Sequence, residues 1–382
     1  MTTTLLTEHQ QALVETTLDF AQDHLAPRAL DWDRDKHFPV DVLRKAAGLG
    51  LGGVYVREES GGSGLSRTDG VFVFETLASG CPSIAGYLSI HNMVAWMIDR
   101  YGDATQRDRW LPRLCAMDDL AGYCLTEPGA GSDAAALTTR AVRDGDDYVL
   151  TGVKQFISGA GAAQLYVVMA RTGGSGADGV SAFVVDKEDP GVGFGPNERK
   201  MGWNAQPTRQ VVLEEVRLPA DRLLGREGDG FRIAMNGLNG GRLGIAACSL
   251  GGARSALDRS LAHLADREAF GRRLLDAQAL RFRLADMATE LAAARALVQQ
   301  AARALDGEDP QAPYLCAMAK RFATDTGYSV ADRALQLHGG YGYLSEYGIE
   351  KIVRDLRVHQ ILEGTNEIMR VIVARGLTEA FG

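Results

Sequence analysis

An apolar repeat between residues 280 and 305 constrains the fold of this 382-residue chain more than any other feature. Its apolar positions recur with 4-3-4-3 spacing and are Leu280, Leu284, Met287, Leu291, Ala294, Val298, Ala301 and Leu305. Such spacing, sustained for nearly four heptads, is typical of a helix in a bundle or coiled coil. At 1.5 Å per residue the helix would span roughly 40 Å. We expect Asp306-Gly307 to end it and further helices to pack against it.

The chain before this repeat divides into a helical part and a β part. Residues 1–118 read as helical: an apolar stripe runs from Val14 to Leu25 before Pro27, and residues 78–102 form one apolar helical stretch ending in glycine. Near residue 119 the spacing of apolar residues changes from that of helices to that of strands. Asp144-Gly145 between β-prone flanks predicts a hairpin, and residues 164–171, 179–186 and 209–219 read as strands. We therefore predict three domains, at residues 1–118, 119–226 and 227–382.

Composition and charge exclude several classes of partner. The chain is 46% hydrophobic and 24% charged, as is usual for globular proteins, and its net charge of -8 without a basic run argues against nucleic acid. Five scattered cysteines without a CxxC pair indicate reduced thiols and a cytoplasmic location; they are Cys81, Cys115, Cys124, Cys248 and Cys316. The N-terminus resembles neither a signal nor a transit peptide, and no apolar run approaches the ~20 residues of a membrane span.

Motifs for common hydrolytic and metal chemistry are absent from the sequence. It contains no Walker A segment, no HExxH and no GxSxG. Its seven histidines are isolated, and we interpret His359 as a structural hydrogen-bonding residue. We expect no metal site, so demanding chemistry would need an organic cofactor.

A carboxylate in an unusual setting is the first candidate for function. In QILEGTNEIMR (360–370), Glu363 stands between the apolar pair Ile361-Leu362 and Gly364. It could simply favour the N-terminus of a helix over residues 366–380, where negative charge is stabilising. It could also be a functional carboxylate, and this segment alone leaves both open.

Three glycine-bearing segments are the other candidates. YCLTEPGAGSDAA (123–135) is either a ligand-contacting turn or a domain linker. MNGLNGGRLGIAACSLGG (235–252) reads as a helix with six glycines, explained equally by close packing or by a ligand that Arg242 could meet. LQLHGGYGYLSEY (335–347) breaks a helix at Gly339-Gly340, which a plain C-cap would also explain.

The order and spacing of YCLTEPGAGSD, KQFISGA, DREAFGRRL, LQLHGGYGY and ILEGTNEIMR resemble the acyl-CoA dehydrogenase family nearly end to end. GWNAQPTR (202–209) and RVHQILEGTNEIMR (357–370) are similar to its isobutyryl-CoA branch in particular. The resemblance implies an α+β multidomain fold: an N-terminal helical domain, a central β-barrel and a C-terminal four-helix bundle, in a homotetramer. It also implies FAD as cofactor, an acyl-CoA substrate and electron-transferring flavoprotein as acceptor.

The resemblance further implies roles for individual residues. Flavin contacts would come from Tyr123, Leu125, Thr126, Gly131, Ser132, Phe156, Ile157 and Ser158, closed by Thr365 and Glu367. Ser158 would donate to flavin N5. The dinucleotide part would be held across a subunit interface by Arg267, Phe270 and Gln278, and on the adenosine side by Gln336, Leu337, Gly339 and Gly340. The substrate would meet Ser132, Asn239, Gly240, Gly241, Arg242 and Gly364.

By the same resemblance Glu363 would be the catalytic base that removes the α-proton of the thioester. Some branches carry this base on the glycine-rich helix, but the corresponding position here is Gly241, which offers no carboxylate. Phe156 and Ser158 stand where many relatives have tryptophan and threonine, which keeps an aromatic face and a hydroxyl donor.

The expected reaction is dehydrogenation of a short branched acyl-CoA, foremost isobutyryl-CoA to methacrylyl-CoA in valine catabolism. The alternatives are 2-methylbutyryl-CoA or n-butyryl-CoA as substrate, an oxidase or flavin monooxygenase on the same fold, and a scaffold without chemistry.

Overall fold

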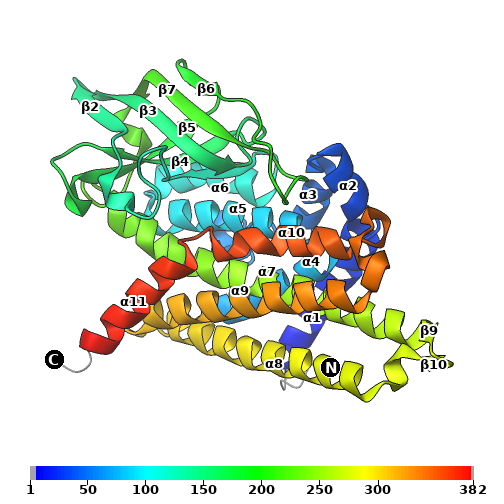
Figure 1. Ribbon diagram of the computed structural model, residues 1–382. Helices are drawn as coiled ribbons and strands as arrows, with labels where there is room; N and C mark the ends of the chain where they lie inside the picture. Colours follow the sequence, from blue (N-terminus) through cyan, green and yellow to red (C-terminus); the bar gives the residue numbers. More distant parts are fainter. Residues whose placement is uncertain (1–5, 380–382) are drawn as a thin grey trace.

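Long helices form a bundle that carries a β-sheet at one end, in a computed structural model that describes residues 6–379 (Figure 1). The N-terminal part is helical, as predicted. Its elements are α1 (Glu8–Phe20), a π-helical turn (Ala21–Leu25), α2 (Ala29–Asp35), α3 (Val40–Ala47), α4 (Arg67–Gly80), α5 (Pro82–Tyr101) and α6 (Ala104–Cys115).

The apolar stretch at 78–102 is two helices rather than the one predicted. Helix α4 ends at Gly80, Cys81 has an extended backbone (φ -154°), and α5 begins at Pro82. Proline suits the first position of a helix, where its missing N–H has no partner to lose. Apolar character runs through the junction because both helices are buried, which hides the break.

The middle part is a mixed eight-stranded sheet. Its strands are β1 (Ala121–Cys124), β2 (Arg140–Asp144), β3 (Asp147–Ser158), β4 (Leu165–Arg171), β5 (Val180–Asp186), β6 (Val192–Phe194), β7 (Thr208–Pro219) and β8 (Leu223–Leu224). They lie in the order β6-β7-β3-β2-β4-β5-β8, with β1 paired to β4. The predicted hairpin joins β2 to β3: Asp144 lies opposite Asp147, and Gly145 takes a φ of 64°.

The C-terminal part returns to helices. They are α7 (Gly230–Asp266), α8 (Gln278–Asp306), α9 (Ala312–Leu337), α10 (Ile349–Arg357) and α11 (Asn366–Glu379). A two-stranded hairpin of β9 (Glu268–Ala269) and β10 (Arg272–Arg273) joins α7 to α8. Helix α8 buries the predicted seam and is capped at Gly307, as expected.

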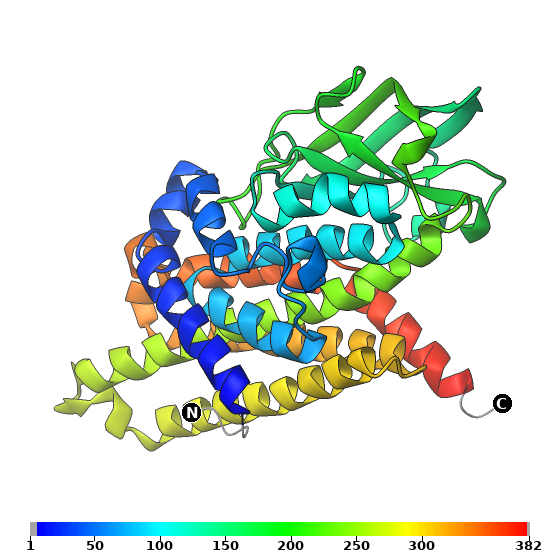
Figure 2. The same ribbon diagram turned by 180° about the vertical axis from the view of Figure 1, so that it is seen from behind.

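The bundle includes a helix from the N-terminal part. Helix α4 packs against α7 and α8, and residues from α4, α7, α8 and α9 share one hydrophobic core. Asp306 at the end of α8 accepts hydrogen bonds from the backbone N–H groups of Arg67 (2.6 Å) and Thr68 (2.9 Å), which caps α4. Seen from behind, α1 lies across the long helices of the bundle (Figure 2). The predicted fold class, helical, then β, then helical, is confirmed.

Candidate active site

Glu363 lies in the short loop between α10 and α11 and is not a helix cap. Thr365 fills that role, because its Oγ1 accepts a hydrogen bond from the backbone N–H of Ile368 (3.3 Å). Glu363 itself adopts a left-handed conformation (φ 57°) followed by Gly364 (φ 89°). Its Oε2 atom is buried and has no hydrogen-bond partner among residues 6–379. Helix α11 begins at Asn366, as the simple N-terminal interpretation expects, but no N–H group of its described residues donates to the buried Oε2.

The glycines of α7 explain how the carboxylate fits. A Cβ on Gly241 would overlap Glu363 Oε2 and would lie 3.0 Å from Met93 Sδ. Gly237 and Gly244, in contrast, let α7 approach side chains of α5, since a Cβ there would overlap Met97 and Ser89. The packing interpretation of the glycine-rich helix therefore holds: Gly237 and Gly244 admit side chains of α5, and Gly241 leaves room for the Glu363 carboxylate.

Arg242 holds the Glu363 loop in place through hydrogen bonds. Its Nε donates to the backbone carbonyl of Glu363 (3.3 Å), and one terminal nitrogen donates to Asn239 Oδ1 (2.8 Å). The side chain is only 4% exposed. Of the residues predicted to face the substrate, Arg242 and Asn239 therefore form a buried support for the Glu363 loop.

Lys320 is a second support that the sequence did not indicate. This buried α9 lysine donates from Nζ to the carbonyl of Gly364 (2.8 Å) and to Asn366 Oδ1 (3.0 Å). A lysine in the mostly small and apolar stretch CAMAKRFA (316–323) was the only available signal, because its partners lie more than 40 positions away.

The surroundings of Glu363 shift its ionisation toward neutrality. Burial disfavours the charged form and raises its pKa to about 7, against the opposing effects of Arg242 and Lys320. Burial also lowers the pKa of Lys320 to about 7. Because a general base works best with a pKa near the working pH, this carboxylate is suited to accepting a proton.

The TEPGAGSD segment is a hydrogen-bonded turn inside the sheet domain. It follows β1, which pairs with β4, so the alternative of a domain linker is wrong. Glu127 forms a buried ion pair with Lys154 (2.9 Å) and accepts from the backbone N–H groups of Thr138 (2.7 Å) and Thr139 (2.8 Å). Burial opposes the charge of Glu127, but Lys154 and the hydrogen bonds outweigh it and lower its pKa to about 2. These contacts hold the turn in one conformation.

Beside this turn lies a face with unsatisfied and exposed groups. The hydroxyl of Tyr123 is buried without a partner in the described part of the chain. Phe156 sits at an irregularity of β3 with a φ of 60° and is 64% exposed. The neighbouring Gln155 N–H donates to the carbonyl of Thr126 (2.8 Å), which joins the turn to β3. At Gly131 a Cβ would meet nothing within 4 Å, so the turn has open space before it.

This face adjoins the Glu363 loop. Tyr123 of β1 and Leu362, the residue before Glu363, both pack against one small apolar cluster. Predicted site residues that gather on this side of the molecule are Tyr123, Leu125, Thr126, Gly131, Ser132, Phe156, Ile157, Ser158, Asn239, Gly240, Gly241, Arg242, Glu363, Gly364, Thr365 and Glu367.

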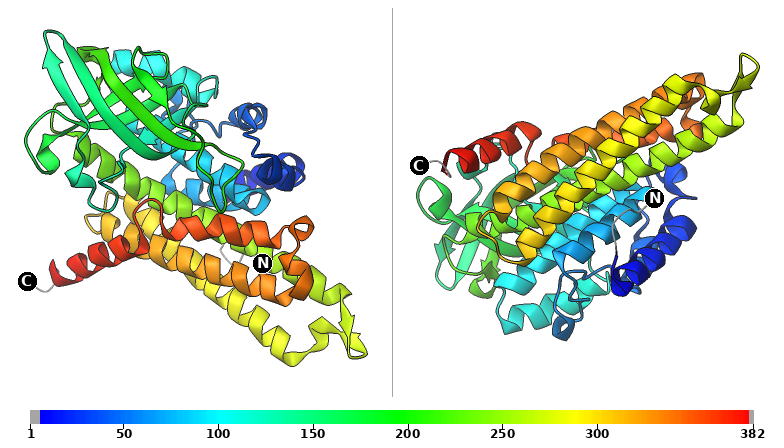
Figure 3. Two further views of the ribbon diagram at one scale, coloured as in Figure 1. Left: turned by 45° about the horizontal axis from the view of Figure 1, so that its top comes forward. Right: turned by 90° about the horizontal axis from the view of Figure 1, so that it is seen from below.

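The remaining predicted residues lie at the other end of the bundle (Figures 1 and 3). The Arg267 guanidinium lies 5.4 Å from the ring centre of Tyr341, next to the end of α9. Phe270 is fully exposed at the tip of the β9–β10 hairpin. This distal group consists of Arg267, Phe270, Gln278, Gln336, Leu337, Gly339 and Gly340. Within one chain the structure does not bring it to Glu363. His338 ends α9 as its C-cap and Gly339 follows with a φ of 58°, so the C-cap interpretation holds there.

A polar cavity of about 520 Å³ opens beside Asn239 and Arg242, which support the Glu363 loop. Asn239, the partner of Arg242, lines it. Further lining comes from α4, α5, α7, the α8–α9 turn and the start of α9, including Arg67, Trp96, Tyr101, Asn236 and Pro313. The buried Arg67 guanidinium lies between the rings of Tyr55 (3.8 Å to the centroid) and Trp96 (4.7 Å).

Neither a metal-binding cluster nor a membrane-spanning helix occurs in the described part of the chain. Among residues 6–379 there is no cluster of three or more His, Cys, Asp or Glu side chains that could hold a metal ion. No helix in that range is long and apolar enough to cross a membrane.

Known proteins match this chain over nearly its whole length. Models of the N-terminal, middle and C-terminal domains of acyl-CoA dehydrogenases match residues 7–118, 122–216 and 228–378. The mitochondrial isobutyryl-CoA dehydrogenases of Bos taurus and Dictyostelium discoideum are each 52% identical, over 98% of this chain and 90% of theirs. A solved structure reported for the electron transferring flavoprotein of Acidaminococcus fermentans aligns with a TM-score of 0.95 and 38% identity, over 99% of both chains.

Proposed function

Because the chain belongs to the acyl-CoA dehydrogenase family, we propose that it oxidises isobutyryl-CoA to methacrylyl-CoA, a step of valine catabolism, with Glu363 as the catalytic base. The reaction class follows from the family, which is FAD-dependent. The short branched substrate is supported by the 52% identity to two isobutyryl-CoA dehydrogenases. 2-Methylbutyryl-CoA and n-butyryl-CoA are the alternative substrates, since one methylene is worth only ~1–3 kcal/mol in such pockets.

The face beside Glu363 fits a flavin. The unpartnered Tyr123 hydroxyl offers a buried polar contact, the exposed ring of Phe156 an aromatic one, and the open space at Gly131 lets the backbone approach a ligand. Tyr123, Leu125, Thr126, Ser132, Ile157 and Ser158 would hold the ring system, with Thr365 and Glu367 closing the site. When bound, FAD supplies the acceptor for the hydride that leaves the substrate's β-carbon.

The observation that carries the assignment of Glu363 is its buried, unpartnered Oε2 beside Gly241. A carboxylate in this state has a raised pKa and a free lone pair, so it can take the α-proton of a thioester. Arg242 and Lys320 hold the backbone on both sides of it and fix its position. The polar cavity that reaches Asn239 would receive the CoA arm.

The distal group supports an assembly in which the cofactor is shared. Arg267 follows the end of α7 and Gly339 the end of α9, at the opposite end of the bundle from the loop between α10 and α11 (Figure 1). We infer that one FAD does not contact both groups of a single chain. A second copy could present its hairpin, with the fully exposed Phe270, to the cofactor of the first. A homotetramer would satisfy this need, and electron-transferring flavoprotein would accept the electrons. All five cysteines are buried and unpaired, which supports a thiol-reducing compartment such as the cytoplasm.

An anaerobic titration of the purified protein with isobutyryl-CoA tests the proposal. Rapid bleaching of the flavin absorbance, faster than with n-butyryl-CoA or 2-methylbutyryl-CoA, is the expected result. Faster bleaching by another acyl-CoA would change the substrate and keep the mechanism. A flavin that no acyl-CoA bleaches would contradict the function, and fast reaction of the reduced, product-bound enzyme with oxygen would indicate an oxidase.

A further inference from the structure

The two ends of the Glu363 loop meet at one side chain of a third helix. Asp325 of α9 accepts a hydrogen bond through Oδ1 from the side-chain amide of Gln360 (2.8 Å) and another from that of Asn366 (2.7 Å). Gln360 precedes the loop and Asn366 follows it, so only residues 361–365 lie between the two donors. One carboxylate oxygen therefore closes the loop into a ring, which we call the loop clamp.

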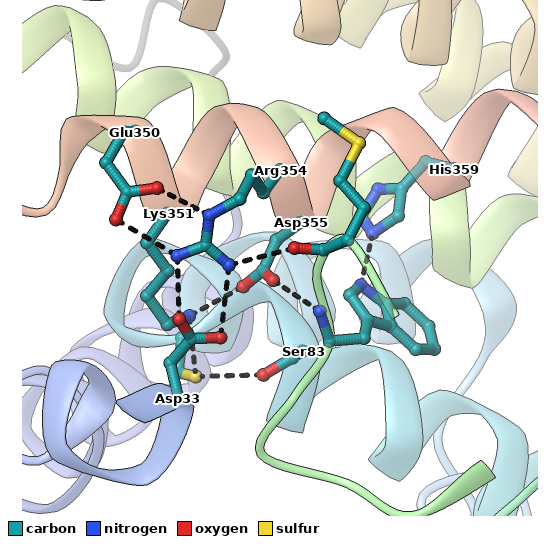
Figure 4. Close-up of polar contacts among 10 residues, drawn as sticks. Asp33, Ser83, Glu350, Lys351, Arg354, Asp355 and His359 are labelled. Carbon is teal, nitrogen blue, oxygen red and sulfur yellow. Dashed lines mark hydrogen bonds and ion pairs between the residues drawn. The ribbon is translucent and has the colours of Figure 1, made fainter. Parts of the chain in front are cut away.

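Helix α10, which leads into the loop, is held in place without Asp325. Its Asp355 forms an ion pair with Lys351 (2.6 Å), and both side chains are buried (Figure 4). His359, in the turn that follows α10, is also buried, and its Nδ1 lies 2.7 Å from Ser249 Oγ of α7. The chain therefore enters the loop from a fixed point.

Asn366, the first residue of α11, is the centre of the loop clamp. Its side chain is buried, its Oδ1 accepts from Lys320 Nζ (3.0 Å), and its Nδ2 donates to Asp325. The lysine nitrogen donates and the carboxylate accepts, so these two neighbours fix which way the amide points. Lys320 also donates to the carbonyl of Gly364 (2.8 Å). The hydrogen bonds thus run from Lys320 through Asn366 and Asp325 to Gln360.

The position of the Glu363 carboxylate depends on its backbone, because no hydrogen bond holds its buried Oε2 within the described part of the chain. That backbone is left-handed at Glu363 (φ 57°) and again at Gly364 (φ 89°). A left-handed conformation in a residue other than glycine is strained and persists only where the surroundings enforce it. Joining residue 360 to residue 366 supplies this constraint from both sides of the loop.

The two oxygens of Asp325 have different partners. Its Oδ2 lies 3.5 Å from a nitrogen of Arg370 and 3.9 Å from one of Arg321, and the side chain is 33% exposed. Exposed ion pairs of this length contribute little to stability. The short contacts are those of Oδ1 with the two amides. Joining the ends of the loop is therefore the main interaction of this side chain.

We propose that Asp325 is a positioning residue for the reaction. By joining Gln360 to Asn366 it sets where the Glu363 carboxylate meets the α-carbon of the substrate. The inference rests on the proposed function, in which Glu363 is the base, and Asp325 acts through the loop without taking part in the proton transfer. Because a displacement of ~1 Å can cost about 10²-fold in rate, opening the clamp should slow flavin reduction and leave acyl-CoA binding intact.

The first test compares Asp325→Ala with Asp325→Asn in the flavin-loaded protein. Alanine opens the clamp, so the limiting rate of flavin reduction by isobutyryl-CoA, per bound flavin, should fall about 10–10²-fold. The half-saturating concentration of isobutyryl-CoA should stay near that of the wild type. Asparagine keeps an oxygen that accepts from both amides, so its rate should be near the wild-type rate. An equal loss in both variants would overturn the proposal.

Asp258→Ala is the matched control. It removes an exposed carboxylate of α7 that pairs with Arg254 on the same helix (2.8 Å). Both the limiting rate and the half-saturating concentration should stay at the wild-type level.

A swapped pair separates the loop clamp from the stability of the fold, and it serves if Asp325→Ala does not fold. Asn366→Asp puts a carboxylate oxygen where an N–H group now donates to Asp325, so like charges meet and the clamp opens. Adding Asp325→Asn gives the new carboxylate an amide donor and leaves an oxygen for Gln360. The single variant should be slow, and the double variant should recover most of the lost rate. No recovery in a folded, flavin-loaded double variant would overturn the proposal.

Amide hydrogen exchange gives a readout that needs no turnover, because it reports local opening. Residues 361–365 should exchange faster in Asp325→Ala than in the wild type, whereas α10, held by its own contacts, should exchange at the wild-type rate. An unchanged limiting rate together with unchanged exchange would overturn the positioning role alone. A wild-type flavin that no acyl-CoA bleaches would instead overturn the proposed function, and with it the catalytic role of the clamp.

Discussion

Gly241 and Glu363 face each other so closely that a Cβ atom on the glycine would overlap Oε2 of the carboxylate. Side chains at two positions 122 residues apart in the sequence would therefore occupy the same place in the structure. We predict that Glu363→Gly abolishes flavin reduction by acyl-CoA and that adding Gly241→Glu restores part of it. General-base catalysis contributes about 10²–10⁴-fold, which bounds the loss and the recovery. Anaerobic stopped-flow bleaching measures both; no recovery in a flavin-loaded double variant would contradict the shared position.

Glu363→Gln isolates the charge from the shape of this side chain. The amide keeps nearly the same volume but cannot accept the α-proton. We expect flavin content and acyl-CoA binding near the wild-type level and bleaching at least 10²-fold slower. Normal bleaching by this variant would exclude Glu363 as the base.

The raised pKa of Glu363 predicts the pH dependence of the reaction. Burial moves it from 4.5 to about 7, and only the ionised carboxylate can accept a proton. The value of kcat/KM should therefore rise about tenfold per pH unit below pH 7 and level off above it, because this parameter reports the free enzyme. A profile that is flat between pH 5.5 and 8 would contradict the assignment.

Lys320 should influence how kcat/KM depends on pH, because its charge acts on the pKa of Glu363. Its positive charge lowers the pKa of Glu363, so Lys320→Met should move the rising limb toward higher pH and slow the reaction. A purely structural role would lower the yield of folded protein or the rate without moving the limb. Lys45→Met, a change on the surface helix α3, is the control and should leave the profile unchanged.

Lys154→Met should destabilise the fold. The variant leaves Glu127 buried without its cation, a defect that typically costs about 3–5 kcal/mol of unfolding free energy. Lys187→Met, at a loose exposed pair with Glu188 (3.9 Å), should change the same quantity by about 0.5 kcal/mol or less. Because the pKa of Glu127 is lowered to about 2, its contribution is present above pH 4.5 and is lost as the pH falls toward 2. Urea melts at pH 7 and pH 3 measure both effects.

Local patterns were sufficient for much of the fold. The seam of α8 and the Asp144-Gly145 hairpin are short-range features, and both were predicted with nearly the observed bounds. The break between α4 and α5 was missed because both helices are buried around it, so hydrophobicity does not change there.

The site was only partly readable from the sequence. Glu363 is conspicuous because it interrupts an apolar segment next to a glycine. Lys320 is much less conspicuous, since its role arises from a contact with a residue 44 positions away. Long-range contacts of this kind leave no periodic pattern. The position of the distal group also depends on how three long helices fold back on one another.

The place of α4 in the bundle has a consequence for the order in which the molecule is assembled during translation. Its main partner, α7, begins at Gly230, about 150 residues after α4 ends. At ~5–20 residues per second the ribosome needs roughly 8–30 s to make that partner. During this interval Val73, Phe74 and Leu77 remain without their final cover. The nascent N-terminal half must therefore be protected from aggregation until α7 and α8 emerge, and a fragment that stops before α7 would keep that apolar face exposed.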